Sequence, residues 1–369
     1  MADPINIIKE GVRGLRAYSL RPDSARIKLN QNENPWDVPQ EIRRETLRRL
    51  ATRPWSRYPD FNPQTLHERL AEFTGWKPDG VLAGNGSNEL IQALLMVAVG
   101  ARTRVLISEP TFALYRQIVT VLGGEVISIP LASELTYDIG ALRGAIESAS
   151  PELTIICSPN NPTGCVIDTQ DLILLLESSR GLVVIDEAYH EFSSQTTVPL
   201  LQQYPNLVVL RTFSKAMALA GLRVGYLLAS SQLVREISKG VLPYNLNVIS
   251  QTAALVALEM YESSLKPLIN LICAERDRLY VELKKIQGLE PVLSRANFMV
   301  IRSAITPRRV FDELLQRDIL IRDVSTYPML QNYFRISVGT PEENDQLLES
   351  LREIFGVRWQ AQRDTALDL

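Results

Sequence analysis

The chain has 369 residues, which is enough for two domains, and its hydrophobic content of 46% is ordinary for a globular protein. A net charge of −3 excludes the basic surface on which nucleic-acid binding depends, so we expect no nucleic-acid partner. No apolar run approaches the roughly 20 residues that span a bilayer, and the first residues lack a secretory signal, so we expect no membrane partner. Two histidines and three cysteines without metal-binding spacing argue against a metal site, and the odd cysteine count favours the cytoplasm.

The N-terminal part of the chain is predicted to contribute an arm, a loop and two helices. Residues 1–30 show little periodicity, and we expect an arm that packs on the body or on a partner subunit. Asn34 lies in an Asn-Glu-Asn-Pro run, which is typical of a loop over a cleft. Helices are predicted at about 39–50 and 63–74, and Tyr58 lies in a proline turn between them.

A glycine-containing turn at residues 84–86 precedes a helix predicted at about 88–99. The glycines allow close approach of the backbone, and Ser87 is a suitable N-cap residue. The free N–H groups and the positive dipole end of such a helix attract phosphate, so Ser87 and Asn88 are candidates for phosphate binding. Taken alone this is weak support, because glycine turns before helices are common.

Strands and helices alternate through the middle of the chain. Apolar, β-branched runs predict strands at residues 104–110, 124–130, 153–157, 182–186, 206–211 and 223–229. Helical patterns lie between some of them, at residues 112–122, 138–148 and 168–179. This order predicts an α/β fold with a mostly parallel sheet flanked by helices.

Three of these strands lead into polar residues. Asn161 follows one strand, Asp186 ends the next, and Ser214 and Lys215 follow a third. Ligands bind at the carboxyl ends of strands in open α/β sheets. A lysine in this position is partly desolvated, which lowers its pKa and makes it nucleophilic toward a carbonyl group. Without the other two strands, a surface lysine would be the better interpretation.

The alternation stops near residue 231. Residues 247–287 are strongly helical, with a break expected near Ser263 or Pro267, and a polar tail from about 357 is expected to be loose. Short strands at 298–302, 319–322 and 333–338, with helices at 307–317 and 341–355, predict a small α/β domain completed by part of the N-terminal segment. The predicted division is an arm at 1–30, part of the small domain at 31–50, a large domain at 51–255 and a small C-terminal domain at 256–369.

Three motifs in order give the chain a resemblance to the fold-type I aminotransferases that use pyridoxal phosphate (PLP). They are Asn-Asn-Pro-Thr-Gly at 160–164, Asp-x-x-Tyr at 186–189, and Ser-Lys at 214–215 followed by Arg223. Each motif is moderate support alone, and their shared order and spacing make the combination specific. The resemblance implies the PLP-dependent transferase fold type I, with a large domain, a smaller α/β domain and PLP as cofactor.

The resemblance also implies a role for each cofactor residue. Lys215 attaches to the cofactor aldehyde and later moves the substrate α-proton, and Asp186 pairs with the pyridine nitrogen. Tyr189 and Asn161 donate hydrogen bonds to the ring oxygen, so that Lys215, Asp186 and Tyr189 form the implied catalytic set. The rest of the implied cofactor set is Ser87, Asn88, Ser214 and Arg223 around the phosphate, and Phe112 over the ring, where a core phenylalanine is an equal alternative.

Over nearly the whole chain the motifs are similar to those of the histidinol-phosphate branch of this family. Arg335 matches the arginine that binds the substrate carboxylate. Arg322 matches a second arginine of this branch, and the alternative is that Arg322 is a surface charge at the edge of a strand. Tyr18 and Asn34 complete the implied substrate site, in which two arginines suit a phosphate tail. Tyr58 matches a tyrosine that reaches the phosphate site of the neighbouring subunit, which implies a homodimer; the alternative is that it packs on its own turn.

The implied reaction transfers an amino group between a small-molecule amino donor and a 2-oxo acid, and histidinol phosphate with 2-oxoglutarate is the expected pair. An aromatic amino-acid aminotransferase and a lyase similar to threonine-phosphate decarboxylase share the same cofactor residues and stay open. A non-catalytic PLP-binding regulator is disfavoured, because we expect no DNA-binding domain before residue 30. A nucleotide-dependent dehydrogenase is weaker still, because the turn at 84–89 lacks the spaced third glycine.

Overall fold

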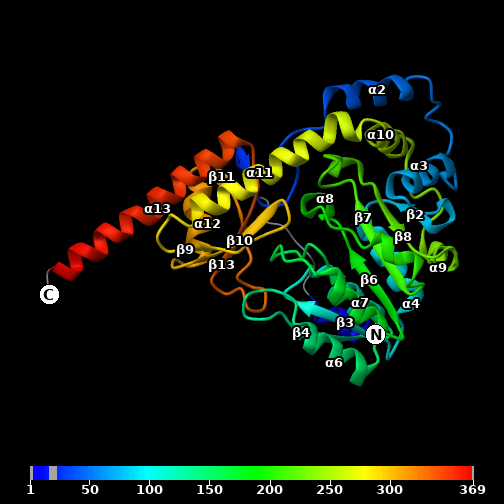
Figure 1. The fold of residues 1–369 in the computed structure, drawn as a ribbon, viewed down its shortest axis with the longest axis horizontal. Coiled ribbons are helices and arrows are strands. Elements are labelled where there is room, and N and C mark those ends of the chain that lie inside the picture. The colour runs from blue at the N-terminus through cyan, green and yellow to red at the C-terminus, as the bar shows by residue number, and fades with distance from the viewer. Residues whose placement is uncertain (1–2, 16–22, 368–369) are drawn as a thin grey trace.

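The fold has two lobes, and the larger one is built around a seven-stranded sheet (Figure 1). The computed structural model describes residues 3–15 and 23–367, and their side chains up to residue 356. The predicted substrate residue Tyr18 therefore lies outside the described residues. Within the described ranges, no helix is long and apolar enough to cross a membrane.

The sheet of the large lobe has the strand order β2-β8-β7-β6-β5-β3-β4. Its members are β2 (Val81–Gly84), β3 (Arg104–Glu109), β4 (Glu125–Pro130), β5 (Leu153–Cys157), β6 (Leu182–Asp186), β7 (Leu207–Thr212) and β8 (Gly225–Leu228). β8 is antiparallel to both of its neighbours, and the other neighbouring strands are parallel. The predicted mostly parallel sheet is confirmed, and β2 joins its edge as a further strand.

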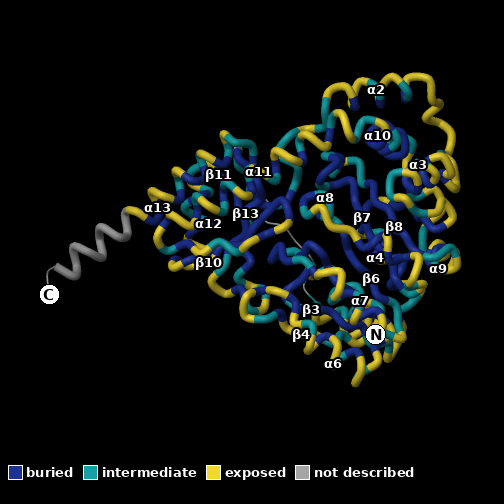
Figure 2. The backbone as a smooth tube through the Cα atoms, in the orientation of Figure 1, coloured by how far each residue is buried: buried dark blue, intermediate teal, exposed yellow. Residues whose placement is uncertain are grey.

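Helices cover both faces of this sheet because its central strands are apolar on both sides. Val183 and Ile185 of β6 belong to one core and Val184 to the other, as the two-residue period of a strand requires. The first core includes residues of α3 (Gln64–Thr74), α6 (Ile139–Ala149), α7 (Thr169–Ser178) and α10 (Val248–Glu259). The second includes residues of α4 (Ser87–Ala98), α5 (Leu114–Leu122) and α9 (Ser231–Ile237). Figure 2 shows the buried strands between helices whose outer sides are exposed.

Helix α2 (Gln40–Leu50) lies on the large lobe, where it packs against α10. Its Ile42 belongs to the first core of the large sheet. The sequence prediction grouped residues 31–50 with the small domain, and α2 does not follow that grouping. The buried residues of α2, Ile42, Thr46 and Leu50, form one narrow stripe, which α10 covers.

The smaller lobe contains a four-stranded antiparallel sheet and a two-stranded parallel pair. The sheet has the order β12 (Arg322–Asp323), β13 (Tyr333–Ser337), β10 (Phe298–Ser303) and β9 (Leu289–Pro291). The pair joins β1 (Ile27–Lys28) to β11 (Ile319–Leu320), so the N-terminal segment completes this lobe as predicted. The lobe also contains α11 (Lys266–Leu283), α12 (Pro307–Gln316) and α13 (Pro341–Leu367), and the short helices elsewhere are α1 (Glu10–Arg13) and α8 (His190–Ser193).

A long helical stretch from α10 to α11 runs from the large lobe to the small one (Figure 1). A π-helical segment, Tyr261–Leu265, interrupts it, which confirms the break predicted near Ser263. α13 continues to Leu367, so the prediction that this helix ends near residue 355 is wrong. Figure 1 shows α13 projecting from the small lobe.

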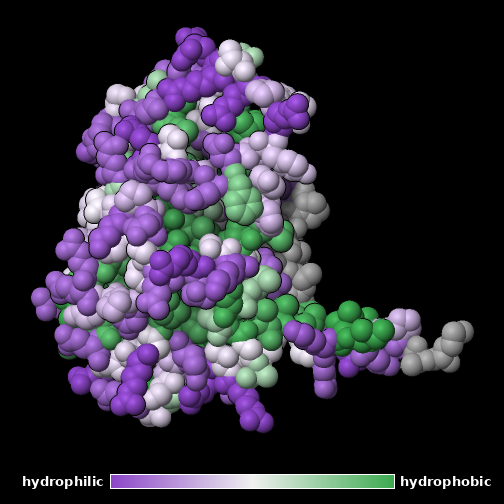
Figure 3. Space-filling model, turned by 90° about the vertical axis from the view of Figure 1, so that its right-hand side faces the viewer, coloured by the Kyte–Doolittle hydropathy of each residue, from purple (hydrophilic) through white to green (hydrophobic). Residues whose placement is uncertain are grey.

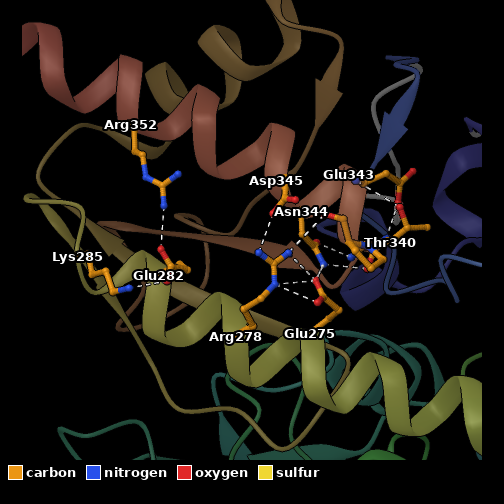
Figure 4. Close-up of polar contacts among 11 residues, drawn as sticks. Glu275, Arg278, Glu282, Lys285, Thr340, Glu343, Asn344, Asp345 and Arg352 are labelled. Carbon is orange, nitrogen blue, oxygen red and sulfur yellow. Dashed lines mark hydrogen bonds and ion pairs between the residues drawn. The ribbon is translucent and has the colours of Figure 1, made fainter.

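Polar contacts tie α11 to the start of α13 (Figure 4). Arg278 of α11 forms ion pairs of 2.7 Å with Glu275 on its own helix and with Asp345 on α13. The buried Asn344 donates to Glu275 at 2.8 Å and to the carbonyl of Gly339 at 2.9 Å. These contacts hold the loop that follows β13, and β13 contributes an arginine to the cavity described next.

Candidate active site

A cavity of about 270 Å³ lies where β5, β6 and β7 end, and β12, β13 and the N-terminal loop at 30–32 complete its lining. The cavity brings together most of the site residues predicted from the sequence. They are Ser87, Asn88, Phe112, Asn161, Asp186, Tyr189, Ser214, Lys215, Arg223, Arg322 and Arg335. The parallel strands explain this convergence, because their carboxyl ends meet at one edge of the sheet.

Lys215 lies in the turn after β7 and is partly buried. Its Nζ donates a hydrogen bond of 2.8 Å to the carbonyl of Gln31 and lies 5.9 Å from the centre of the Tyr189 ring. Burial, assisted by the positive charges of Arg335 and Arg223, lowers the pKa of Lys215 to about 8. About half of this amine is therefore unprotonated and nucleophilic at mildly alkaline pH.

Asp186 is the last residue of β6 and is 3% exposed. Its Oδ2 accepts a hydrogen bond of 2.6 Å from the hydroxyl of Tyr115, and its Oδ1 accepts one of 3.1 Å from the main-chain N–H of Ala188. Burial raises the pKa of Asp186 to about 6, and these two hydrogen bonds oppose that rise. The carboxylate is thus mostly ionised at neutral pH and places a negative charge in the cavity wall.

The hydroxyl of Tyr189 is held by two amides. Asn32 donates to its oxygen at 3.1 Å and Asn161 at 3.3 Å. Burial raises the pKa of Tyr189 above its ordinary value, so the hydroxyl keeps its proton. Because the oxygen already accepts two hydrogen bonds, that proton is available for a group in the cavity.

A cluster of donors surrounds the start of α4. Arg223 donates to the hydroxyl of Ser214 at 3.1 Å and to the carbonyl of Ala220 at 3.0 Å. Gly86 has a φ of +80°, a backbone conformation that requires glycine, and a Cβ there would lie 2.5 Å from Nη2 of Arg223. No side chain caps the first turn of α4, which begins at Ser87. A guanidinium, hydroxyls and free N–H groups form a set that suits a phosphate group.

Arg322 and Arg335 lie opposite each other on the antiparallel strands β12 and β13. Arg335 donates to Oδ1 of Asn161 at 2.6 Å and to the carbonyl of Asn30 at 2.8 Å. Its guanidinium lies 5.2 Å from the centre of the Phe298 ring, and the residue is 7% exposed. The small lobe thus presents two cations to the cavity, and these contacts hold one of them in place.

Phe112 lines the cavity and also makes an edge-on contact with Tyr115, with ring centres 5.5 Å apart. The side chain of Asn34 lines a neighbouring cavity of about 280 Å³ instead and donates to the carbonyl of Ala216 at 3.2 Å. Tyr58 is 80% exposed and does not line this cavity; its ring stacks on that of Tyr244, with ring centres 4.4 Å apart. The structure therefore does not place Asn34 and Tyr58 with the other predicted residues of this chain.

Two residues that form hydrogen bonds to predicted site residues were not themselves predicted from the sequence. Tyr115, which bonds Asp186, lies in the first turn of an amphipathic helix, so its position was typical of a core residue. Asn32, which bonds Tyr189, lies in the same Asn-rich run as Asn34. That run of side-chain amides was the available signal for Asn32.

The donors and acceptors of this cavity suit PLP, group by group. Lys215 provides a nucleophilic amine for an aldehyde, and Asp186 provides an anion for a pyridine nitrogen. Tyr189 has a free hydroxyl proton for a ring oxygen, and the start of α4 with Arg223 suits a phosphate. Fold and cavity together define a PLP-dependent enzyme of fold type I.

Comparisons with known proteins agree with this class. Residues 25–351 match the model of the family described as aminotransferase class I and II. The histidinol-phosphate aminotransferase of Chlorobium phaeovibrioides is 37% identical over 356 residues, which cover 96% of this chain and 98% of that protein. The chain belongs to the class I and II aminotransferases, in the group of histidinol-phosphate aminotransferases, and it is a PLP-dependent transaminase.

Solved structures share the fold. The histidinol-phosphate aminotransferase of Sinorhizobium meliloti, in complex with pyridoxal-5'-phosphate, has a TM-score of 0.85 at 24% identity, covering 94% of this chain and 97% of that one. The L-threonine-O-3-phosphate decarboxylase of Porphyromonas gingivalis has a TM-score of 0.78 at 22% identity, covering 89% of this chain and 99% of that one. Since an aminotransferase and a decarboxylase share it, the fold alone does not select the reaction.

Proposed function

We propose that this transaminase exchanges an amino group between L-histidinol phosphate and 2-oxoglutarate, giving imidazole acetol phosphate and L-glutamate, as a step of histidine biosynthesis. The observation that carries the proposal is the pair of opposed arginines, Arg322 and Arg335, in the cavity wall. A held guanidinium suits the carboxylate of glutamate, and two guanidinium groups suit the phosphate of the other substrate. The similarity to the histidinol-phosphate aminotransferase of Chlorobium phaeovibrioides supports the same substrate.

PLP, when bound, supplies an aldehyde that takes up the substrate amine and a ring that accepts the electron pair released at the α-carbon. Lys215 would bind that aldehyde, and Asp186 would hold the ring nitrogen in its protonated form. Tyr189 and Asn161 would bond the ring oxygen. The phosphate would be held by Ser87, Asn88, Ser214 and Arg223.

Lys215 is then the group that moves the substrate proton. Its amine becomes free when the substrate amine takes its place, and it can accept the α-proton and return it to the neighbouring carbon. The lowered pKa of Lys215, about 8, suits both steps near neutral pH, because a base that holds its proton too strongly returns it slowly. Arg335 would bind the substrate carboxylate and thereby orient the α-carbon toward this amine.

The proposal includes a homodimer in which Tyr58 reaches the phosphate site of the partner subunit. It is supported by a group of exposed apolar side chains close to Tyr58, which stacks on Tyr244, as Phe61 also contacts Tyr244. Figure 3 views the right-hand side of Figure 1, where α3 and α9 lie, and shows apolar side chains exposed there among polar ones. The group consists of Trp55, Tyr58, Phe61, Leu242 and Tyr244. A clustered apolar surface of this kind is typical of a protein interface, and two identical subunits would bury it about a two-fold axis.

A panel of amino donors tests the substrate. Histidinol phosphate, phenylalanine, tyrosine and threonine phosphate are each supplied with 2-oxoglutarate, and kcat/KM is measured from glutamate formation. We expect histidinol phosphate to be the best donor, with unphosphorylated histidinol as the matched control that shows what the phosphate contributes. Equal or higher values for phenylalanine or tyrosine would indicate an aromatic aminotransferase. Carbon dioxide released from threonine phosphate would indicate a lyase.

A further inference from the structure

A buried phenol lies against the carboxylate of Asp186 on the side of α5. Tyr115 is fully buried, and its hydroxyl donates to Oδ2 of Asp186 at 2.6 Å. Oδ1 of the same carboxylate accepts from the N–H of Ala188 at 3.1 Å. Each carboxylate oxygen can accept two hydrogen bonds, so these contacts leave acceptor capacity on Asp186 for a group in the cavity.

We propose that Tyr115 is a positioning residue that keeps Asp186 ionised and correctly oriented for the ring nitrogen of the cofactor. The inference rests on the role proposed above for Asp186. A carboxylate at the end of a buried strand loses its hydration, and a hydrogen bond to its charged form replaces part of that loss. A phenol suits this purpose because it keeps its own proton: burial and the charge of Asp186 raise the pKa of Tyr115 well above its ordinary value.

The other groups around Asp186 do not supply this hydrogen bond. Cys157 lies beside it on β5, and burial raises the pKa of that thiol, which stays protonated. Glu187 is the next residue, and its negative charge raises the pKa of Asp186, although Glu187 itself forms an ion pair of 2.8 Å with Arg211. Within the described ranges, Tyr115 is the side chain that donates a hydrogen bond to Asp186.

The decisive variant is Tyr115→Phe, which removes the hydroxyl and keeps the ring. Its matched control is Tyr137→Phe, because Tyr137 is another buried tyrosine, whose hydroxyl donates instead to the carbonyl of Cys157. The measurement is the dissociation constant of PLP from each apoprotein as a function of pH, by quenching of tryptophan fluorescence. Affinity should fall as pH decreases through the pKa of Asp186, because the neutral acid no longer attracts a protonated ring nitrogen.

Loss of the phenol should raise the pKa of Asp186 and move the midpoint of this fall to higher pH. Loss of a hydrogen bond to a charged group corresponds to about one pH unit in the midpoint, which would lower the affinity for PLP about twofold at pH 7 and about tenfold at pH 5. Tyr137→Phe should leave the midpoint where it is in the unmodified protein. Equal midpoints for the two tyrosine variants would overturn the proposal.

The variant Asp186→Asn distinguishes the role proposed for Asp186 from the role proposed for Tyr115. An amide does not titrate, so the affinity of this variant for PLP should no longer fall near the pKa of Asp186. Adding Tyr115→Phe to this variant should change its affinity for PLP no further. If Asp186→Asn keeps the midpoint, the role of Asp186 is refuted. If Asp186→Asn loses the midpoint but Tyr115→Phe leaves it in place, only the role of Tyr115 is refuted.

Should Tyr115→Phe fail to fold, 3-fluorotyrosine at position 115 is a more acidic donor that should lower the midpoint, and an unchanged midpoint would refute the proposal.

Discussion

Lys215 and Gln31 are joined by a hydrogen bond of 2.8 Å, from the lysine Nζ to a main-chain carbonyl 184 positions earlier in the sequence. A second contact, from the amide of Asn34 to the carbonyl of Ala216, ties the same two segments together. The N-terminal loop thus lies directly on the reactive amine. Because the pKa of this amine is lowered to about 8, its state of protonation changes within the range of ordinary assays.

The rate of covalent attachment of PLP to the apoprotein should rise with pH. Only the unprotonated amine of Lys215 attacks an aldehyde, and a pKa of about 8 places the midpoint of this rise near pH 8. The measurement is borohydride trapping at short times between pH 6.5 and 9.5, with the labelled peptide identified by mass spectrometry. Lys239, on the surface and paired with Glu236, is the matched control, and Lys239→Ala should be labelled normally at Lys215. A label on another lysine, or a rate independent of pH, would contradict this expectation.

Arg335→Ala should weaken the reaction with glutamate and with 2-oxoglutarate. Removing one partner of a buried, hydrogen-bonded charge pair costs about 2–5 kcal/mol, and here the substrate carboxylate loses that partner.

Arg322→Ala should reduce kcat/KM for histidinol phosphate more than for glutamate. Arg302→Ala serves as control, because Arg302 is exposed and pairs with Glu290 on the small lobe. Equal losses for both substrates in Arg322→Ala would argue against phosphate binding by Arg322.

Mixed dimers should reveal whether Tyr58 acts in the partner's site. Lys215→Ala and Tyr58→Ala are each expected to be severely impaired as homodimers. In a mixed dimer one site receives both defects and the other receives neither, so co-refolding should restore up to one working site per mixed dimer. The measurement is activity of mixed dimers whose composition is verified by native mass spectrometry. Verified mixed dimers without recovered activity would place Tyr58 in its own subunit's site or in none.

Arg211→Met should destabilise the protein strongly, although the residue does not line the cavity. Arg211 and Glu187 form a buried ion pair with side chains 5% and 2% exposed, and removing one partner of such a pair costs about 3–5 kcal/mol. Urea unfolding measures this loss, with the exposed pair Arg143–Glu147 as control, where Arg143→Met should cost at most about 1 kcal/mol. The deficit should shrink toward pH 5, because protonation of the unpaired Glu187 removes its buried charge. A deficit equal to that of the control would contradict the expectation.

The sequence alone determined the large sheet and most of the cavity lining. Short apolar, β-branched runs predicted β5, β6 and β7, because a strand buried on both faces is mostly apolar. Parallel strands end at one edge of the sheet, so the polar residues that follow them, Asp186 and Lys215, had to meet there. These predictions needed only local patterns and one rule of topology.

Only the tertiary structure decided which distant residues hold those groups. Asn32 bonds Tyr189 across 157 positions, and Tyr115 bonds Asp186 across 71, and neither contact leaves a local pattern in the sequence. Tyr115 has the spacing of a core residue on an amphipathic helix, because a buried phenol and a buried hydrocarbon ring satisfy the same periodicity. The side of the molecule on which α2 packs is likewise undetermined locally, since its short apolar stripe is buried only when α10 lies against it.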